Sequence, residues 1–395
     1  MINIQCRICG STDLTKYLDL GTQPLANSLV KPGNSDLEEN PLQVYFCNDC
    51  SFSQLGEVVD PHKMYTHYLY QSSVSEHFKG HCIGLAETLK KMIGKQTPWV
   101  IDVACNDGCL MKALHSEGFK GVGIEPAENL AKIARSKKID TISDYWSRDL
   151  ALGCHYDVVT ALNVFAHIDD LKEFCLATKK FLMHEGILVI EVPWLLNTIF
   201  RNQFDTIYHE HLSYFSLKAI DTKLTQHGLK IFKAEIVKMH GGSLRIYACK
   251  ESTRKEESSV ELIRNIERAC GLHELDTYMV YKENVARIKR RFLNILESVN
   301  NKKVVGYGAC AKGISLINYC GITTKQIQAI ADDTKDKQGL ETPGSRIPII
   351  SSEQMKAMNP DYIVLLAWNF TDELKNKTQW FKGKYILTMP RARIE

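Results

Sequence analysis

Two CxxC pairs near the start of the chain limit how its first part can fold. The four cysteines are Cys6, Cys9, Cys47 and Cys50. A CxxC turn lets two thiolates approach one ion while the backbone bends beneath them, so two such turns complete a tetrahedral zinc site. The insert of residues 10–46 exceeds the usual spacing of about 15 to 20 residues, and its prolines and glycines suit a segment that loops outward. We therefore expect a structural zinc ion in a small N-terminal domain, in preference to a redox pair.

The length and charge of the chain restrict its class and its partners. Its 395 residues suggest two to four domains. The formal net charge is +3 and no basic block occurs, so we expect no nucleic-acid or membrane partner and instead a small-molecule ligand. The sequence shows no long apolar span and no signal peptide. The odd number of cysteines, 13, fits reduced thiols and metal ligands, and we expect a cytoplasmic protein.

A nucleotide-binding layout begins after Pro98. We expect a strand over residues 99–103, a tight turn over 104–108, a helix, and a second strand that ends at Glu125. In a parallel sheet this order places a nucleotide at the carboxyl edge, where Glu125 would accept hydrogen bonds from ribose hydroxyls. The turn lacks GxGxxG, and its polar side chains suit S-adenosylmethionine, although an unliganded βαβ scaffold has a similar start. The predicted cofactor contacts are Asp102, Asn106, Asp107, Gly108, Glu125 and Asn163.

The densest group of titratable side chains lies in residues 208–213, Tyr-His-Glu-His-Leu-Ser. Such groups move protons near neutral pH, and perturbed titratable groups cluster at functional sites. A zinc-protease site needs histidines four residues apart, whereas His209 and His211 are two apart. We therefore expect a reaction centre here, although either histidine alone could be a hydrogen-bonded core residue. His167 follows another predicted strand and is expected to face the same cleft.

A second βα unit begins at Lys303. Gly306 and Gly308 allow a tight turn, and Lys312 could meet a phosphate at the start of the next helix. Without a third glycine at the GxGxxG position, this turn is a weak signal for a dinucleotide. A charged run and long helical patterning over residues 250–299 predict a connector before it. The predicted substrate contacts along the chain are Tyr68, His240, Ser243, Lys312, Trp368 and Asn369.

Five motifs occur in an order that resembles one enzyme family. They are the CxxC pairs, NDG at residues 106–108, YHEHLSYFS at 208–216, HGGS at 240–243 and GYGAxAKG at 306–313. In this order they resemble the sugar C-methyltransferases that act on nucleotide-linked 4-keto-6-deoxy sugars, and the resemblance covers nearly the whole chain. It implies an α/β protein with three domains: a zinc-binding domain (1–70), a Rossmann-like S-adenosylmethionine domain (71–250) and a C-terminal Rossmann-like domain (251–395) that helps hold the nucleotide sugar.

The resemblance also implies roles for the site residues. By similarity His211 would be the general base, with Glu210 and Tyr208 supporting it, His167 in the cleft and Tyr70 or Tyr68 contributed by the first domain. The implied reaction methylates C3 of a dTDP- or GDP-linked sugar: the 4-ketone acidifies the C3 proton, and a base can remove it to leave an enolate. The enzyme would be a monomer or a small homo-oligomer.

One residue departs from the family pattern. Ala104 stands in the first turn, where methyltransferases of this type usually carry glycine. Because alanine is small, we expect a slightly altered cofactor loop that still binds. Two other classes remain open, a nicotinamide-dependent sugar oxidoreductase that uses the turn at Gly306, and a non-catalytic zinc-stapled binding protein.

Overall fold

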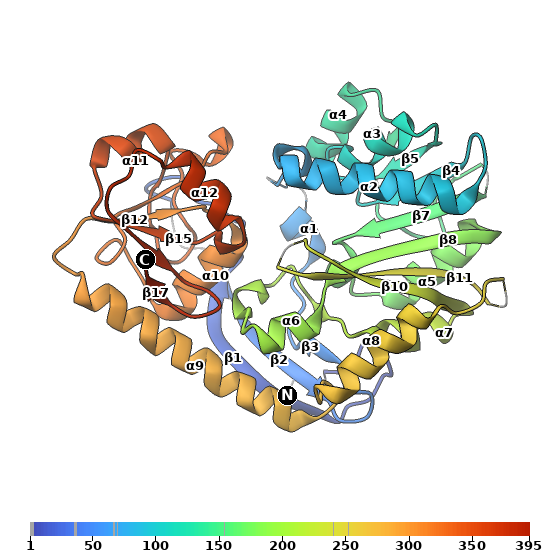
Figure 1. Ribbon diagram of the computed structural model, residues 1–395, viewed down its shortest axis with the longest axis horizontal. Coiled ribbons are helices and arrows are strands. Elements are labelled where there is room, and N and C mark those ends of the chain that lie inside the picture. Colours follow the sequence, from blue (N-terminus) through green and yellow to red (C-terminus); the bar gives the residue numbers. More distant parts are fainter. Residues whose placement is uncertain are drawn as a thin grey trace.

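The computed structural model describes residues 4–34, 38–65, 68, 70–153, 155–239, 241–251 and 253–395. Within these ranges the chain forms three β-sheets with helices around them (Figure 1), which confirms the expected α/β class. None of the helices in these ranges combines the length and the apolar character needed to cross a membrane.

The first sheet is antiparallel and has four strands. Its order is β1 (Leu14–Pro24), β2 (Glu39–Cys47), β3 (Ser53–Leu55) and β9 (Ser213–Tyr214). Alternate residues of β2 are buried, as expected for a strand with one face on a core. The last strand comes from far along the chain: Ser53 pairs with Tyr214, and Gln54 pairs with Ser213. The sheet that carries the cysteines therefore includes two residues that we predicted to lie in the central domain.

The second sheet has seven strands in the order β10-β11-β8-β7-β4-β5-β6. The strands are β4 (Trp99–Val103), β5 (Lys120–Ile124), β6 (Thr141–Ile142), β7 (Tyr156–Leu162), β8 (Leu182–Pro193), β10 (Leu229–Val237) and β11 (Ser243–Lys250). Strands β4 to β8 are parallel, whereas β10 and β11 pair antiparallel. The order reverses between β4 and β7, and ligands of open α/β sheets bind at such a point, beside the carboxyl ends of the strands.

Helices cover both faces of this sheet. Successive residues of a strand point to opposite faces, so Val100 packs with one group of helices and Ile101 with the other. The first group is α2 (Glu76–Ile93), α3 (Cys109–Ser116) and α4 (Glu128–Ser136), and the second is α5 (Leu171–Phe181), α7 (Leu217–Thr225) and α8 (Ser258–Ala269). Both faces are covered, which explains why residues 156–161 of β7 and 186–192 of β8 are buried without alternation.

The third sheet has the order β14-β13-β12-β15-β16-β17. Its strands are β12 (Val304–Tyr307), β13 (Ala329–Ala331), β14 (Ile349–Ile350), β15 (Tyr362–Leu365), β16 (Lys384–Leu387) and β17 (Arg393–Ile394), with helices α10 (Ala311–Cys320), α11 (Ser352–Met358) and α12 (Thr371–Lys377). All its pairings are parallel except that of β16 with β17. The βα unit predicted from Lys303 is thus confirmed as β12 and α10.

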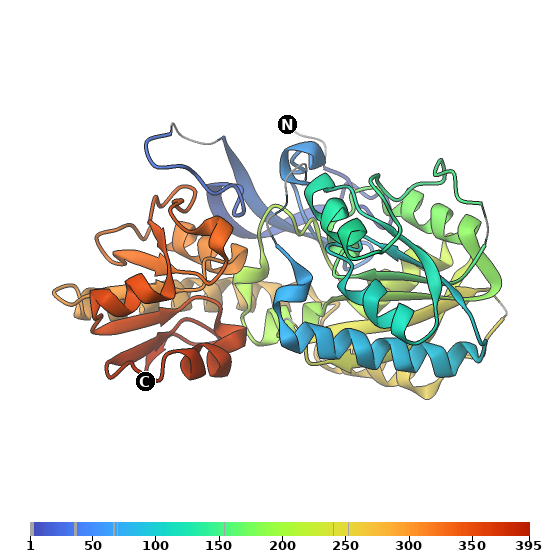
Figure 2. The same cartoon turned by 90° about the horizontal axis from the view of Figure 1, so that it is seen from above.

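One long helix, α9 (Leu275–Ser298), ties the first and third sheets together (Figures 1 and 2). At 1.5 Å per residue its 24 residues span about 36 Å. Its buried residues recur every three or four positions, the pattern of a helix with one apolar face. Near its start Tyr278 packs edge to face on Tyr17 of β1, and Leu296 near its end joins the core of the third sheet. The predicted connector is therefore part of a core shared by two sheets.

Candidate active site

A cavity of about 590 Å³ lies at the carboxyl edge of the seven-stranded sheet. The ends of four parallel strands contribute Val103, Ile124, Leu162 and Pro193 to its lining. Residues of the first 70 positions close it from one side, and residues around the start of α10 close it from the other. The switch point of the central sheet thus opens into a space that all three parts of the chain enclose.

The cysteines predicted to bind zinc come together in the fold. The sulfur atoms of Cys6, Cys9, Cys47 and Cys50 all lie within 4.8 Å of one another. The Sγ atoms of Cys6 and Cys50 are 3.5 Å apart, and those of Cys9 and Cys47 are 3.6 Å apart. Tetrahedral zinc with Zn–S bonds of about 2.3 Å requires sulfur separations of about 3.8 Å. The donor set and its spacing fit one zinc ion with no open coordination position, which makes the site structural.

His211 lines the cavity and is held at both ring nitrogens. Its Nδ1 donates to the carbonyl of Thr206 at 2.7 Å, so the lone pair is on Nε2, which accepts from the Tyr208 hydroxyl at 2.8 Å. Burial raises the pKa of Tyr208 well above its usual range, so the phenol stays a donor. The arrangement keeps the imidazole in one tautomer, with its basic nitrogen on the side of Tyr208.

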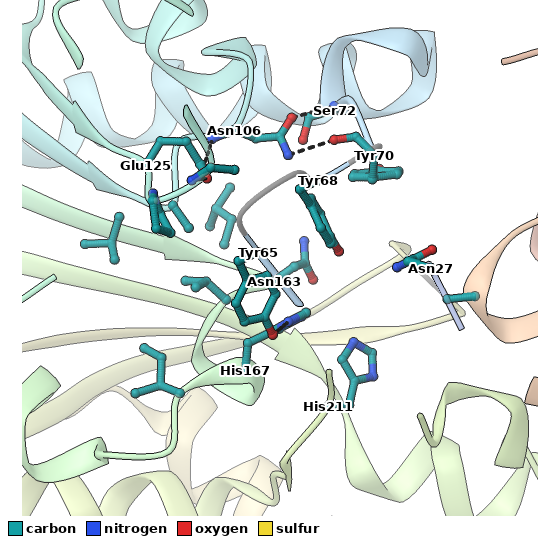
Figure 3. Close-up of a pocket in the computed structure, with 18 of the residues that line it drawn as sticks. Asn27, Tyr65, Tyr68, Tyr70, Ser72, Asn106, Glu125, Asn163, His167 and His211 are labelled. Carbon is teal, nitrogen blue, oxygen red and sulfur yellow. Dashed lines mark hydrogen bonds between the residues drawn. The ribbon is translucent and has the colours of Figure 1, made fainter. Parts of the chain in front are cut away.

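His167 lies against His211 (Figure 3). The two rings meet edge to face with centroids 4.9 Å apart. Nδ1 of His167 is 3.0 Å from the hydroxyl of Tyr65, and desolvation by burial lowers the pKa of His167 to about 4. With Tyr65 donating, the neutral ring keeps its proton on Nε2. His167 is therefore suited to donate a hydrogen bond, and not to serve as a cationic acid.

Glu210 stands apart from His211 and outside the lining of this cavity. Its carboxylate accepts from the Tyr68 hydroxyl at 2.8 Å and from Nδ2 of Asn27 at 2.6 Å. Burial raises the pKa of Glu210 to about 7, although both hydrogen bonds act in the opposite direction. It also borders a second cavity of about 200 Å³ that shares Asn27 with the first. Glu210 thus acts on Tyr68 and has no direct hydrogen bond to His211 among the contacts of the described residues.

The cofactor residues predicted from the sequence divide into two groups. Asn106, Glu125 and Asn163 line the cavity, as does Ala104. The Glu125 carboxylate accepts from the backbone amides of Asn106 at 2.8 Å and Ala127 at 2.9 Å, and burial raises its pKa. These bonds fix the carboxylate beside the first turn (Figure 3) and use only part of its acceptor capacity.

Asp102, Asp107 and Gly108 do not line the cavity. Asp102 accepts from Thr160 Oγ1 at 2.7 Å, and burial raises its pKa to about 7. Asp107 is fully buried and holds Ser73 and, at 3.0 Å, the amine of Lys137. The side chains of Asp102 and Asp107 thus bond to residues that do not line the cavity.

Two polar atoms in the lining have no hydrogen-bond partner among the described residues. They are Oδ1 of Asn163 and Nε1 of Trp146, both buried. A buried polar atom without a partner costs about 1 to 3 kcal/mol, so a ligand that satisfies it binds more tightly. Sequence reasoning missed Trp146, because a lone tryptophan between predicted elements belongs to no motif.

The predicted substrate contacts are only partly brought together. Tyr68, Lys312 and Asn369 line the cavity, and so does Tyr70, which was predicted to be catalytic. The indole of Trp368 donates to Asp205 at 2.5 Å outside the lining, and Ser243 is buried with its hydroxyl bonded to the Met239 carbonyl at 3.1 Å. His240 lies outside the described residues. Lys337, which lines the cavity near Lys312, was not predicted.

Family models match three consecutive parts of the chain. A zinc-binding domain matches residues 6–65, a methyltransferase domain matches 79–234, and a C-methyltransferase C-terminal domain matches 238–390. These matches agree with the closed set of four thiolates and with the cavity at the switch point.

Similar proteins include one of nearly the same length. C-methyltransferase NovU of Streptomyces niveus is 32% identical over 404 aligned positions, which cover 99% of this chain and 96% of that protein. Among solved structures, the PH0226 protein of Pyrococcus horikoshii OT3 is 16% identical with a TM-score of 0.40 and covers 49% of this chain and all of its own. A magnesium protoporphyrin IX methyltransferase of Synechocystis PCC 6803 is 15% identical with a TM-score of 0.35, over 44% of this chain and 79% of its own.

The full-length relative and the three domain matches confirm the family expected from the motifs. They also confirm an enzyme with a zinc-binding domain and an S-adenosylmethionine-dependent methyltransferase domain. The chain belongs to the C-methyltransferase family.

Proposed function

We propose that this enzyme methylates C3 of a nucleotide-linked 4-keto-6-deoxy sugar and that His211 is the general base. One observation carries the proposal: a single cavity joins the Glu125 turn, the His167–His211 pair and the cationic start of α10. A cofactor, a reacting carbon and an anionic group can therefore be held in one line.

The cofactor end of the cavity suits S-adenosylmethionine. Glu125 retains free acceptor capacity for ribose hydroxyls, and Asn163 and Trp146 offer a buried acceptor and a buried donor. The bound cofactor supplies an electrophilic methyl group. The surrounding apolar side chains exclude water from the space where that group reacts.

The two histidines have different roles in the proposed proton transfer. Nε2 of His211 takes the C3 proton after the Tyr208 hydroxyl breaks its hydrogen bond to that nitrogen. The Thr206 carbonyl stabilises the resulting imidazolium by accepting from Nδ1. The electrons of the broken C–H bond form a C3–C4 double bond while the π electrons of the carbonyl move to the C4 oxygen, which gives an enolate. His167 stays neutral and donates from Nε2 to that oxygen, where the new charge develops. The enolate carbon is then the nucleophile for methyl transfer.

The nucleotide diphosphate, of dTDP or GDP, would lie toward α10. Lys312 stands in the first turn of this helix, and its amine lies over the Trp368 ring, 5.6 Å from the centroid. Lys337 also lines the cavity, and its amine donates to the Ala309 carbonyl at 2.9 Å and lies 3.5 Å from Asp332. A helix N-terminus and two cations attract phosphates. A cytoplasmic location and a monomer or small homo-oligomer remain predictions of the same proposal.

The turn at Gly306 gives little support to a nicotinamide-dependent alternative. The amide of Ala309, which a pyrophosphate would need, already donates to Asp332 at 2.8 Å. A Cβ at Gly308 would come within 2.7 Å of the Ala367 side chain, so this glycine serves close packing inside the third sheet. The second alternative, a non-catalytic binding protein, does not fit a member of an enzyme family.

The proposal is tested with a panel of nucleotide-linked 4-keto-6-deoxy sugars. Each sugar is incubated with S-adenosylmethionine, and the products are weighed by mass spectrometry and located by NMR. A gain of one methyl group at C3 is expected. Methylation at another atom, or NADH fluorescence that depends on the protein, would contradict the proposal.

A further inference from the structure

Arg7 stands between the two cysteines of the first CxxC turn, yet its side chain leaves the zinc site. The guanidinium donates to the carbonyl of Leu212 at 3.1 Å, to the carbonyl of Leu55 at 3.0 Å and to the carboxylate of Asp169 at 2.8 Å. Its side chain is only 9% exposed, which shields the bonds to the two carbonyls, whereas the bond to Asp169 lies at the surface. One cation therefore joins the zinc turn to segments from two other parts of the chain.

Two of these partners are neighbours of the histidine pair. Leu212 follows His211 directly, and Asp169 lies two residues after His167. The two segments come from different elements, since η2 (Phe165–His167) follows β7, whereas His211 precedes β9. Arg7 thus bridges the two segments whose histidine rings meet edge to face.

We propose that Arg7 is a positioning residue that fixes His211 and His167 relative to each other, and that zinc sets its position. The inference rests on the proposed roles of the two histidines. It gives the zinc site a part in the reaction that a closed four-thiolate site does not otherwise have.

The main chain of Arg7 is held as firmly as its side chain. Its amide donates to Oε1 of Gln54 at 2.8 Å, and its carbonyl accepts from the amine of Lys223 at 3.0 Å. Cys6 and Cys9 flank it in the zinc turn, so a bound ion fixes the direction in which the side chain leaves the backbone. The geometry of the zinc turn is thus passed to the histidine pair through one rigid group.

Only arginine can make these three contacts together. A guanidinium is planar and presents its donors in a fixed fork, whereas the lysine amine is a single point on a flexible stem. Both carbonyls accept from Nη1, whereas Asp169 accepts from Nε, so a single lysine amine could reach the carbonyls or the carboxylate but not all three groups. A shift of about 1 Å at reacting groups can cost about 10²-fold in rate. A positive charge at position 7 is therefore not sufficient to position the two histidines.

The test compares Arg7→Lys and Arg7→Met with Arg264→Met as a matched control. Arg264 also bridges segments, through Asp221 at 2.9 Å and Glu256 at 2.6 Å, and is not among the residues that line the cavity. In full-length protein with one zinc per chain, both Arg7 variants should lower kcat about 10- to 100-fold with KM and cofactor affinity nearly unchanged. Arg264→Met should leave kcat unchanged.

A second readout needs no substrate. In protein with ¹⁵N-labelled histidine, the ring signals of His211 and His167 should move in both Arg7 variants and stay in place in Arg264→Met. If an Arg7 variant does not fold, Asp169→Ala is used in its place. The Asp169 side chain is 54% exposed, so this variant should fold. Loss of the Asp169 carboxylate should move the His167 signals.

The outcomes separate this inference from the proposed function. Unmoved ring signals in the Arg7 variants and in Asp169→Ala would overturn the positioning role, whatever the reaction is. A variant whose ring signals move while kcat stays at the wild-type value would overturn the link to catalysis. If His211→Asn also kept full activity, the proposed base would fail by itself.

Discussion

Replacing His211 with asparagine tests the assignment of the general base. The amide of the introduced asparagine would be close to the position of Nδ1 and could still donate to the Thr206 carbonyl, so the loop should keep its shape. What the change removes is Nε2, the atom that faces Tyr208. A positioned base contributes about 10² to 10⁴-fold, which corresponds to about 2.7 to 5.5 kcal/mol of barrier. Turnover should fall by that factor while cofactor affinity stays nearly constant.

Hydrogen exchange separates proton removal from methyl transfer. The wild-type enzyme, incubated in heavy water with the keto sugar and S-adenosylhomocysteine, should exchange the C3 hydrogen for deuterium without methylating it. His211→Asn should not exchange it. His209→Asn is the matched control, because Nε2 of His209 bonds to the Asn40 carbonyl at 3.1 Å outside the cavity. Exchange by the His211 variant at the wild-type rate would refute the reasoning and point to His167 as the next candidate.

Three further changes test the metal site, the cofactor site and the buried histidine. Protein purified without chelator should contain one zinc per chain by elemental analysis, and Cys47→Ser should lose it and unfold the N-terminal part, because metal binding there is folding energy. Glu125→Ala should weaken S-adenosylmethionine by about 1 to 3 kcal/mol in calorimetry, and an unchanged Kd would place the adenosine elsewhere. His167 has a folded pKa of about 4 against 6.5 unfolded, so its stabilisation is complete above pH 6.5 and falls by about 3 kcal/mol by pH 4. Urea titrations should show that His167→Gln is less acid-sensitive than the wild type, and equal sensitivity would contradict the buried neutral state.

Local patterns predicted the elements and the clustered residues well. The strand expected over residues 99–103 is β4, and the four cysteines converge as their spacing indicates. His211, Tyr208 and His167 meet in one cavity. Each of these expectations depended on a short motif or on the rule that parallel strands present their carboxyl ends at one edge.

The side-chain directions were harder to predict. Asp102 and Asp107 come at the expected positions in the chain, yet they turn to Thr160 and Lys137 and not to the cavity. Asn27 reaches the site from a loop with no periodic pattern, so no sequence signal marks its bond to Glu210. Such partners depend on tertiary packing, which spacing along the chain does not specify.

Ala104 shows how a departure from a family pattern is accommodated. Its backbone has φ of +55°, in the left-handed region where glycine is favoured. A side chain costs about 1 to 2 kcal/mol there. Asn106, two residues later, has the same φ, so two residues of this turn other than glycine adopt the left-handed conformation.

The late arrival of β9 has a consequence for synthesis on the ribosome. All four zinc ligands and β1 to β3 have been made by residue 55, but the partner of β3 begins at Ser213. The ribosome must add residues 56–212 first, which takes about 8 to 30 s at about 5 to 20 residues per second. During that time the nascent sheet has an open edge, and open edges pair with other chains. A fragment that ends at residue 70 would keep this edge open permanently and should self-associate.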